Sequence, residues 1–121
     1  MKIGEIVTAL PALQKLASEK LTLKTLYKVS HMMSMLDKEI SFYNQERMKI
    51  IESLGNNVEN DKWKIPEENI EEFNNRMNEL LNIEIASEIK PVELPVSENV
   101  EMSYNDIKAL DGFIILGFAD T

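Results

Sequence analysis

The sequence predicts an α+β protein, mainly α: a long antiparallel helical hairpin with an N-terminal helix and a small C-terminal β or extended region. Two observations predict this class. An apolar repeat with an average spacing of 3.5 residues runs through residues 23–54, and the apolar periodicity becomes alternating after residue 82. The first pattern keeps a narrow stripe facing a partner helix, and the second is typical of strands. We therefore expect one domain over 1–121, divided into an N-terminal helix (1–20), a hairpin (22–82) and strands, a short helix and an apolar tail (83–121).

The long helix is predicted by its apolar repeat, which we call the seam. The steps between its members alternate between three and four residues, and Arg47 is its only charged member. The members are Leu26, Val29, Met33, Leu36, Ile40, Tyr43, Arg47, Ile50 and Leu54. Thr22 occupies the position of an N-cap, and Gly55 suits the left-handed conformation that ends many helices. The segment is therefore a helix of roughly 50 Å that packs along its length.

A second helix is predicted after Pro66, which fits the first turn of a helix. Its apolar stripe consists of Ile70, Phe73, Met77, Leu80 and Leu81. Residues 55–65 are expected to form a polar loop between the two helices. The second helix covers only about 25 Å of the first. The other half of the seam must be buried by the N-terminal helix, by the C-terminal segment or by another chain, and this mismatch is the main argument for self-association.

Proline and capping residues define the two ends of the chain. Because proline is tolerated mainly in the first turn of a helix, Pro11 predicts that the first helix spans about 9–19. Residues 2–7 are then a separate short helix or strand. Pro91 and Pro95 restrict the run between them to an edge strand or an extended arm. Further capping and apolar signals predict a short helix from Ser103 through Leu110 and a buried strand or docking segment in 112–118.

Composition excludes several classes of function. The chain has no cysteine, which excludes disulfides, thiolate metal sites and cysteine nucleophiles. The net charge is −8; residues 1–30 carry five lysines and two glutamates, and the rest carries eight basic and nineteen acidic residues. An acidic body argues against direct nucleic-acid binding. No apolar run reaches the ~20 residues of a membrane span, and the N-terminus does not read as a signal peptide. We expect a cytoplasmic protein without a membrane partner.

Two stretches carry a resemblance to known proteins. The first runs from the residues PALQKLA at 11–17 through KTLYKV at 24–29 to DKEI at 37–40. The second comprises EFN at 72–74, NELLNIE at 78–84 and Pro91. Together they resemble a family of small uncharacterised phage and prophage proteins of Gram-positive bacteria. The resemblance implies a phage product that works in the host cytoplasm or in a virion. It supplies no activity and no functional residues.

The sequence offers no catalytic, cofactor-binding or metal site. His31 is the only histidine and has no carboxylate three or four residues away. The acidic cluster Glu67, Glu68, Glu71 and Glu72 could hold Mg²⁺, but acidic residues in a first turn are also favoured by the helix dipole. No glycine-rich phosphate loop, nucleotide motif or serine–histidine arrangement is present. We therefore expect that the protein is not an enzyme and has no cofactor.

The candidate functional residues are those expected at an interface with another chain. Arg47 either pairs with an acidic partner, or lays its stem along the seam with its charge in water. Met32, Met35 and Phe42 lie to one side of the seam, where they fill the core or form a second contact face. The complete set of interface candidates is Leu26, Val29, Met33, Met35, Phe42, Arg47, Phe113, Ile115 and Phe118.

Two functions are compatible with these observations. The first is a non-enzymatic interaction protein that associates with itself as a dimer or larger oligomer, and with another phage or host protein. The second is an acidic inhibitor that occupies the nucleic-acid site of a host protein, because clustered carboxylates imitate phosphates. The first requires an apolar face shared between chains, whereas the second requires acidic side chains gathered on one face.

Overall fold

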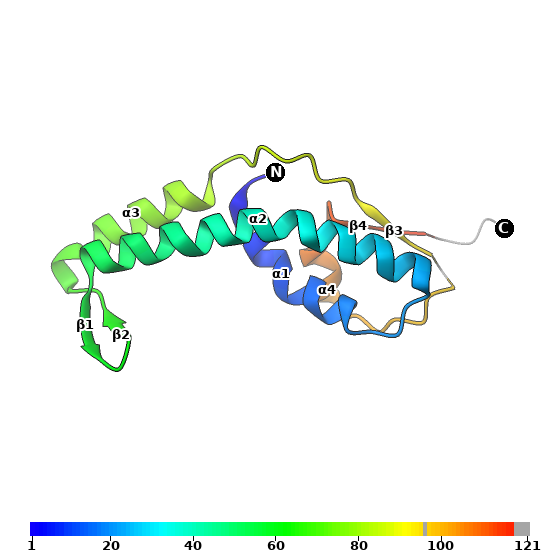
Figure 1. Cartoon of the computed structure of the whole chain (residues 1–121), viewed down its shortest axis with the longest axis horizontal. Helices are drawn as coiled ribbons and strands as arrows, with labels where there is room; N and C mark the ends of the chain where they lie inside the picture. The colour runs from blue at the N-terminus through cyan, green and yellow to red at the C-terminus, as the bar shows by residue number, and fades with distance from the viewer. Residues whose placement is uncertain (96, 118–121) are drawn as a thin grey trace.

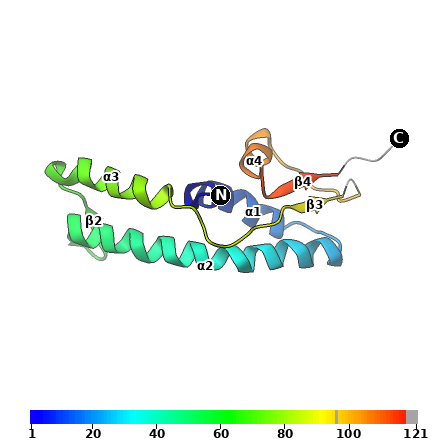
Figure 2. The same cartoon turned by 90° about the horizontal axis from the view of Figure 1, so that it is seen from above.

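One long helix runs through almost the whole length of an elongated molecule (Figure 1). The computed structural model describes residues 1–95 and 97–117. The long helix is α2 (Leu23–Leu54), and α3 (Ile70–Leu81) runs back antiparallel beside its C-terminal half. α1 (Ile3–Ala17) and the C-terminal β region lie against its N-terminal half (Figure 2). The predicted class, α+β and mainly α with a helical hairpin, is confirmed.

The core lies at one end of this molecule, which we call the proximal region. It is built from α1, the N-terminal half of α2 and the C-terminal strands and short helix. Its buried members are Ile6, Ala9, Ala12, Leu13, Leu16, Val29, Met32, Leu36, Val92, Leu94, Leu110, Phe113 and Ile114. The part of the seam that α3 does not reach is therefore covered by α1 and by the C-terminal region of the same chain. The length mismatch does not by itself require a second chain.

The first helix begins earlier than the sequence predicts, because Pro11 lies inside α1 rather than in its first turn. A proline in a helix interior removes one hydrogen bond and costs about 3 kcal/mol. Here Pro11 is exposed, whereas residues on the opposite side of the helix, such as Ile6 and Leu13, are fully buried. Burial of several such side chains outweighs the cost, because each contributes about 1.5–3 kcal/mol.

The C-terminal region forms a two-stranded parallel sheet whose strands lie far apart in the sequence. β3 (Val92–Leu94) pairs with β4 (Ile114–Leu116), and the six-residue helix α4 (Tyr104–Ala109) belongs to the connection between them. Pro91 and Pro95 flank β3 directly, as expected of a short strand with a free edge. The predicted capping box of α4 is present, since the Asp106 N–H donates to Ser103 Oγ at 3.1 Å.

The other end of the molecule, which we call the distal region, contains the C-terminal half of α2, α3 and a β-hairpin. The hairpin corrects the prediction of a polar loop: β1 (Asn56–Glu59) pairs antiparallel with β2 (Lys62–Lys64). Its turn consists of Asn60 and Asp61, with φ values of 43° and 64°. Asparagine and aspartate tolerate positive φ well, which is why they suit a tight hairpin turn. A 3₁₀ turn, η1 (Glu67–Asn69), then leads into α3.

Gly55 ends α2 for a different reason from the one that the sequence suggests. Its φ is −105°, so the left-handed conformation is not used. A Cβ at this position would lie 2.7 Å from the carbonyl oxygen of Ile51 and 2.9 Å from Cδ1 of Ile65. Glycine is needed because the chain turns back closely against the helix that it leaves.

The N-terminal residues connect α1 to the end of α3. The Ile3 N–H donates to the Ile83 carbonyl at 3.0 Å, and the Ile85 N–H donates to the Met1 carbonyl at 2.9 Å. The Met1 ammonium lies 2.9 Å from Glu84, which raises the pKa of the ammonium and lowers that of the carboxyl. The alternation around residues 83–86 thus corresponds to a single bridge between Lys2 and Glu84 rather than to a strand.

Candidate interaction surface

Two of the nine interface candidates lie in the core of the single chain. Val29 and Phe113 are 0% and 1% exposed. Placing them at an interface was wrong, because α1 and the C-terminal strands already cover this part of the seam. Met33 is half-buried against the same core, and Leu26 is also half-buried. The proximal part of the seam therefore belongs to the chain's own folding.

The other candidates lie at the surface or outside the described residues. Arg47 is exposed, and none of the ion pairs among residues 1–95 and 97–117 involves it, so its position matches the alternative in which the charge stays in water. Ile115 is 54% exposed on the outer face of the small sheet, opposite Glu93. Phe118 lies outside the described residues. Met35 and Phe42 remain, half-buried and exposed respectively.

Met35 and Phe42 belong to a second row of side chains along α2, beside the seam. At 3.6 residues per turn, the members of this row share an arc of roughly 140° around the helix. We call this row the lateral face. It contains Tyr27, His31, Met35, Phe42, Glu46 and Ile50, the last of which it shares with the seam, and the same arc also carries Lys24, Lys28, Lys38 and Lys49. Its large side chains are only partly covered, since Tyr27 is 70% exposed and Phe42 is 42% exposed.

The N-terminal half of the lateral face forms one wall of a groove of about 510 Å³. The opposite wall is the extended segment 88–93. The rings of Tyr27 and His31 stack at its rim, with centroids 6.2 Å apart and planes inclined by 14°. The groove is mainly apolar, and its charged side chains are two lysines and two glutamates, Lys28, Lys90, Glu88 and Glu93.

The C-terminal half of the lateral face forms a second groove, of about 470 Å³, together with α3. Its apolar lining comes from Phe42 and Ile50 of α2, from Leu80 of α3 and from Ile83, which follows α3. Arg76 lines the groove from α3; it donates to Glu72 of the same helix at 2.8 Å and to the Ser53 hydroxyl of α2 at 3.3 Å. The two helices of the hairpin therefore leave a partly apolar hollow on this side.

A polar contact separates the two grooves. The Ser87 hydroxyl donates to Glu39 Oε1 at 3.1 Å, which fixes the segment after α3 against the middle of α2. The two grooves therefore lie on the same side of α2, one on each side of this contact. The sequence identified Met35 and Phe42 as interface candidates and placed Ile50 in the seam, but Tyr27 was missed. The sequence signal for this face is the spacing of four, four and seven residues from Tyr27 through His31 and Met35 to Phe42, which places these side chains on one side of a helix.

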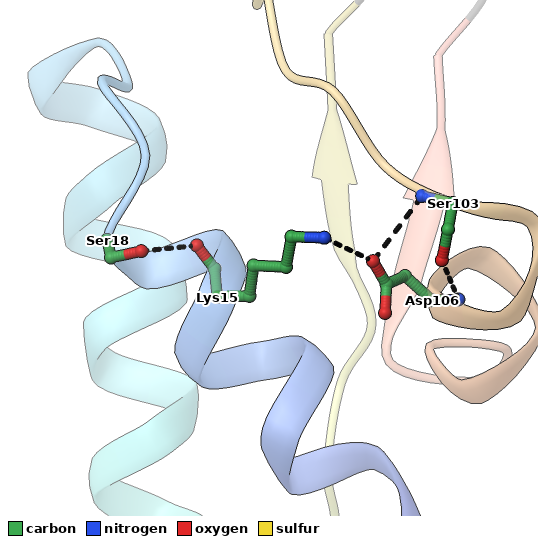
Figure 3. Close-up of polar contacts among 4 residues, drawn as sticks. All are labelled: Lys15, Ser18, Ser103 and Asp106. Carbon is green, nitrogen blue, oxygen red and sulfur yellow. Dashed lines mark hydrogen bonds and ion pairs between the residues drawn. The ribbon is translucent and has the colours of Figure 1, made fainter.

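A separate cluster of titratable groups joins α1 to α4 and has a structural role (Figure 3). Lys15 Nζ donates to Asp106 at 2.9 Å, and the same carboxylate accepts from the Ser103 N–H at 3.4 Å. The ion pair lowers the pKa of Asp106 and raises that of Lys15. The Ser18 hydroxyl donates to the backbone carbonyl of Lys15 and not to the Asp106 carboxylate. Ser103 and Asp106 therefore cap α4 and the Lys15–Asp106 pair attaches it to α1, whereas Ser18 acts only at the end of α1.

Within residues 1–95 and 97–117, no three histidine, cysteine or acidic side chains converge in a way that could hold a metal ion. In the same residues, no helix combines the length and the apolar character needed to cross a membrane. The acidic residues of η1 and the first turn of α3 are all exposed to solvent. The candidate interaction surface is the lateral face, along which two grooves lie on one side of α2.

Comparison with known proteins identifies no relative: no family model, no curated protein and no solved structure matches the chain.

Proposed function

We propose that the chain is a non-enzymatic interaction protein that acts through helix-mediated self-association and protein binding. The observation that carries this proposal is that the helical hairpin of α2 and α3 in the distal region is incompletely covered. Among residues 37–54 of α2, only Leu54 is buried, whereas Phe42 and Met48 are 42% and 37% exposed. Two helices alone cannot bury a stripe on each side, and four-helix arrangements solve this problem by adding a second pair.

The resemblance to phage proteins supports a placement in the cytoplasm of an infected host cell or in a virion. A small phage-encoded protein of this kind would bind another phage or host protein in addition to its own copies. This part of the proposal rests on the resemblance alone.

Light scattering over a series of protein concentrations tests the proposal. We expect a mass above the 13.9 kDa of one chain at micromolar concentration. Phe42→Glu should lower that mass, because it places a charge in the uncovered groove. Val58→Glu is the matched control: Val58 is 63% exposed on β1, away from both grooves, so the substitution should leave the mass unchanged. A mass of one chain at every concentration would contradict self-association.

The alternative function is an acidic inhibitor that imitates nucleic acid. Residues 39–82 carry ten acidic and five basic side chains, and the four glutamates before and within the first turn of α3 are exposed. Such an inhibitor would bind a basic host protein with an affinity that falls steeply with salt. Neutralising Glu67, Glu68 and Glu71 together should abolish that binding while leaving self-association intact.

A further inference from the structure

We propose that two copies of this chain pack antiparallel through their lateral faces, with a two-fold axis beside Lys38 and Glu39. This arrangement rests on the self-association proposed above and specifies its surface and geometry. Each copy places the N-terminal half of α2 against the C-terminal half of the partner's α2. The groove beside Tyr27 on one copy then faces the groove beside Ile50 of the partner subunit.

The order of side chains along the lateral face is self-complementary in this arrangement. Around an axis between residues 38 and 39, Met35 lies opposite the partner's Phe42, and Tyr27 lies opposite the partner's Ile50. Large apolar or aromatic groups therefore meet one another at each of these positions. An interface of this kind uses the same patch on both copies, as a two-fold dimer requires.

Charge on α2 favours the antiparallel direction over the parallel one. The N-terminal half exposes Lys24, Lys28 and Lys38, with Asp37 as its only carboxylate. The C-terminal half carries three glutamates, and α3 adds five more with its preceding turn. Of the three basic side chains in this half of α2 and in α3, two have acidic neighbours: Lys49 pairs with Glu46, and Arg76 pairs with Glu72. Around the axis between residues 38 and 39, an antiparallel pair sets Lys38 beside the partner's Glu39 and Lys28 beside the partner's Lys49. A parallel pair would set every charged side chain beside its own copy, so the antiparallel direction brings fewer like charges together.

His31 gives this arrangement a specific contact. Its exposed ring lies on the lateral face and is stacked on that of Tyr27, with centroids 6.2 Å apart. In the antiparallel pair it faces the partner's Glu46. In a parallel pair it would instead face the partner's His31.

Single-cysteine variants test this geometry directly, because the chain contains no cysteine of its own. The variants are His31→Cys, Glu46→Cys and Lys38→Cys, with Asn44→Cys as a control that is exposed on the opposite side of α2. At about 1.5 Å of rise per residue, two copies of position 31 lie about 22 Å apart along the antiparallel pair. Mild oxidation of the mixed His31→Cys and Glu46→Cys proteins should give a disulfide-linked dimer. Neither variant should cross-link with itself, whereas Lys38→Cys should.

Each outcome separates this geometry from self-association in general. Cross-linking of His31→Cys with itself shows a parallel pair and overturns the proposal. A dimer by light scattering in which only Asn44→Cys cross-links, or in which none of the four does, places the interface elsewhere; the geometry then fails while the proposed function stands. A single-chain mass for the unmodified protein at every concentration overturns both.

Discussion

The proximal and distal regions of this protein are built on the same helix but differ in how completely they bury it. In the proximal region, α2 lies against α1 and the C-terminal sheet, and Val29 and Leu36 are at most 1% exposed. In the distal region α2 packs against α3, and Tyr43 and Ile50 stay half-buried. Where two layers cover the helix, its apolar side chains form a core. Where one neighbour covers it, the side chains on the other side stay partly exposed. The difference separates the part of the chain that forms the buried core from the part whose apolar side chains stay partly exposed.

The largest effect is expected from removing a side chain at the centre of the proximal core. Phe113→Ala should lower the free energy of unfolding by about 3–5 kcal/mol, because a fully buried aromatic ring leaves a cavity. Urea denaturation measures this loss. The matched distal variant Phe73→Ala removes a half-buried ring and should cost clearly less. Equal losses for the two variants would contradict the contrast between the regions.

The second comparison stays within the seam, at neighbouring positions on α2. Leu36→Ala should cost roughly 2–5 kcal/mol, since Leu36 is 1% exposed. The sequence predicts deep burial for Ile40 as well, but the structure shows it half-buried, one helical turn nearer the distal region. Ile40→Ala should therefore cost less than Leu36→Ala, by the same urea measurement. A larger loss of unfolding free energy for Ile40→Ala in dilute protein would mean that the proximal core, in which two layers cover α2, extends further along this helix.

The third test perturbs the distal region alone. Gly55→Ala forces a Cβ against the carbonyl of Ile51, and overpacking of this kind costs roughly 1–3 kcal/mol. Hydrogen exchange should then become faster in α3 and in the C-terminal turns of α2, while α1 keeps its protection. Faster exchange in α1 to the same degree would show that the two regions unfold as one unit.

The smallest effect concerns the pH dependence of the proximal end of α2. Glu98 accepts hydrogen bonds from the Thr22 hydroxyl at 2.6 Å and from the Thr22 N–H at 3.2 Å, and these bonds lower the pKa of its carboxyl below the ordinary value of 4.5. Its stabilising contribution is therefore present above pH 4.5 and is lost as the pH falls through the lower pKa of the folded state. Glu98→Gln should lower the Tm slightly at pH 7 and hardly at all at low pH. A Tm difference that grows on acidification would contradict this role.

Sequence reasoning was most successful where the signal is local. The 3.5-residue repeat identified α2 and its buried side, Pro66 marked the approach to α3, and the spacing of Ser103 and Asp106 defined the cap of α4. Each of these depends on residues within a turn or two of one another, and the backbone geometry converts their spacing directly into a face or a cap. The lateral face was visible in part for the same reason, through Met35 and Phe42.

What the tertiary structure decided was which neighbour covers each face. Pro11 lies inside a helix because burial elsewhere on α1 outweighs its local cost, and β3 finds β4 across a separation of about twenty residues that no local pattern encodes. The sequence leaves three alternatives for what covers the proximal part of the seam, and in the folded chain α1 and the C-terminal region cover it together. Periodicity specifies that a side chain must leave water but not which distant segment excludes the water, because that choice depends on the packing of all the elements together.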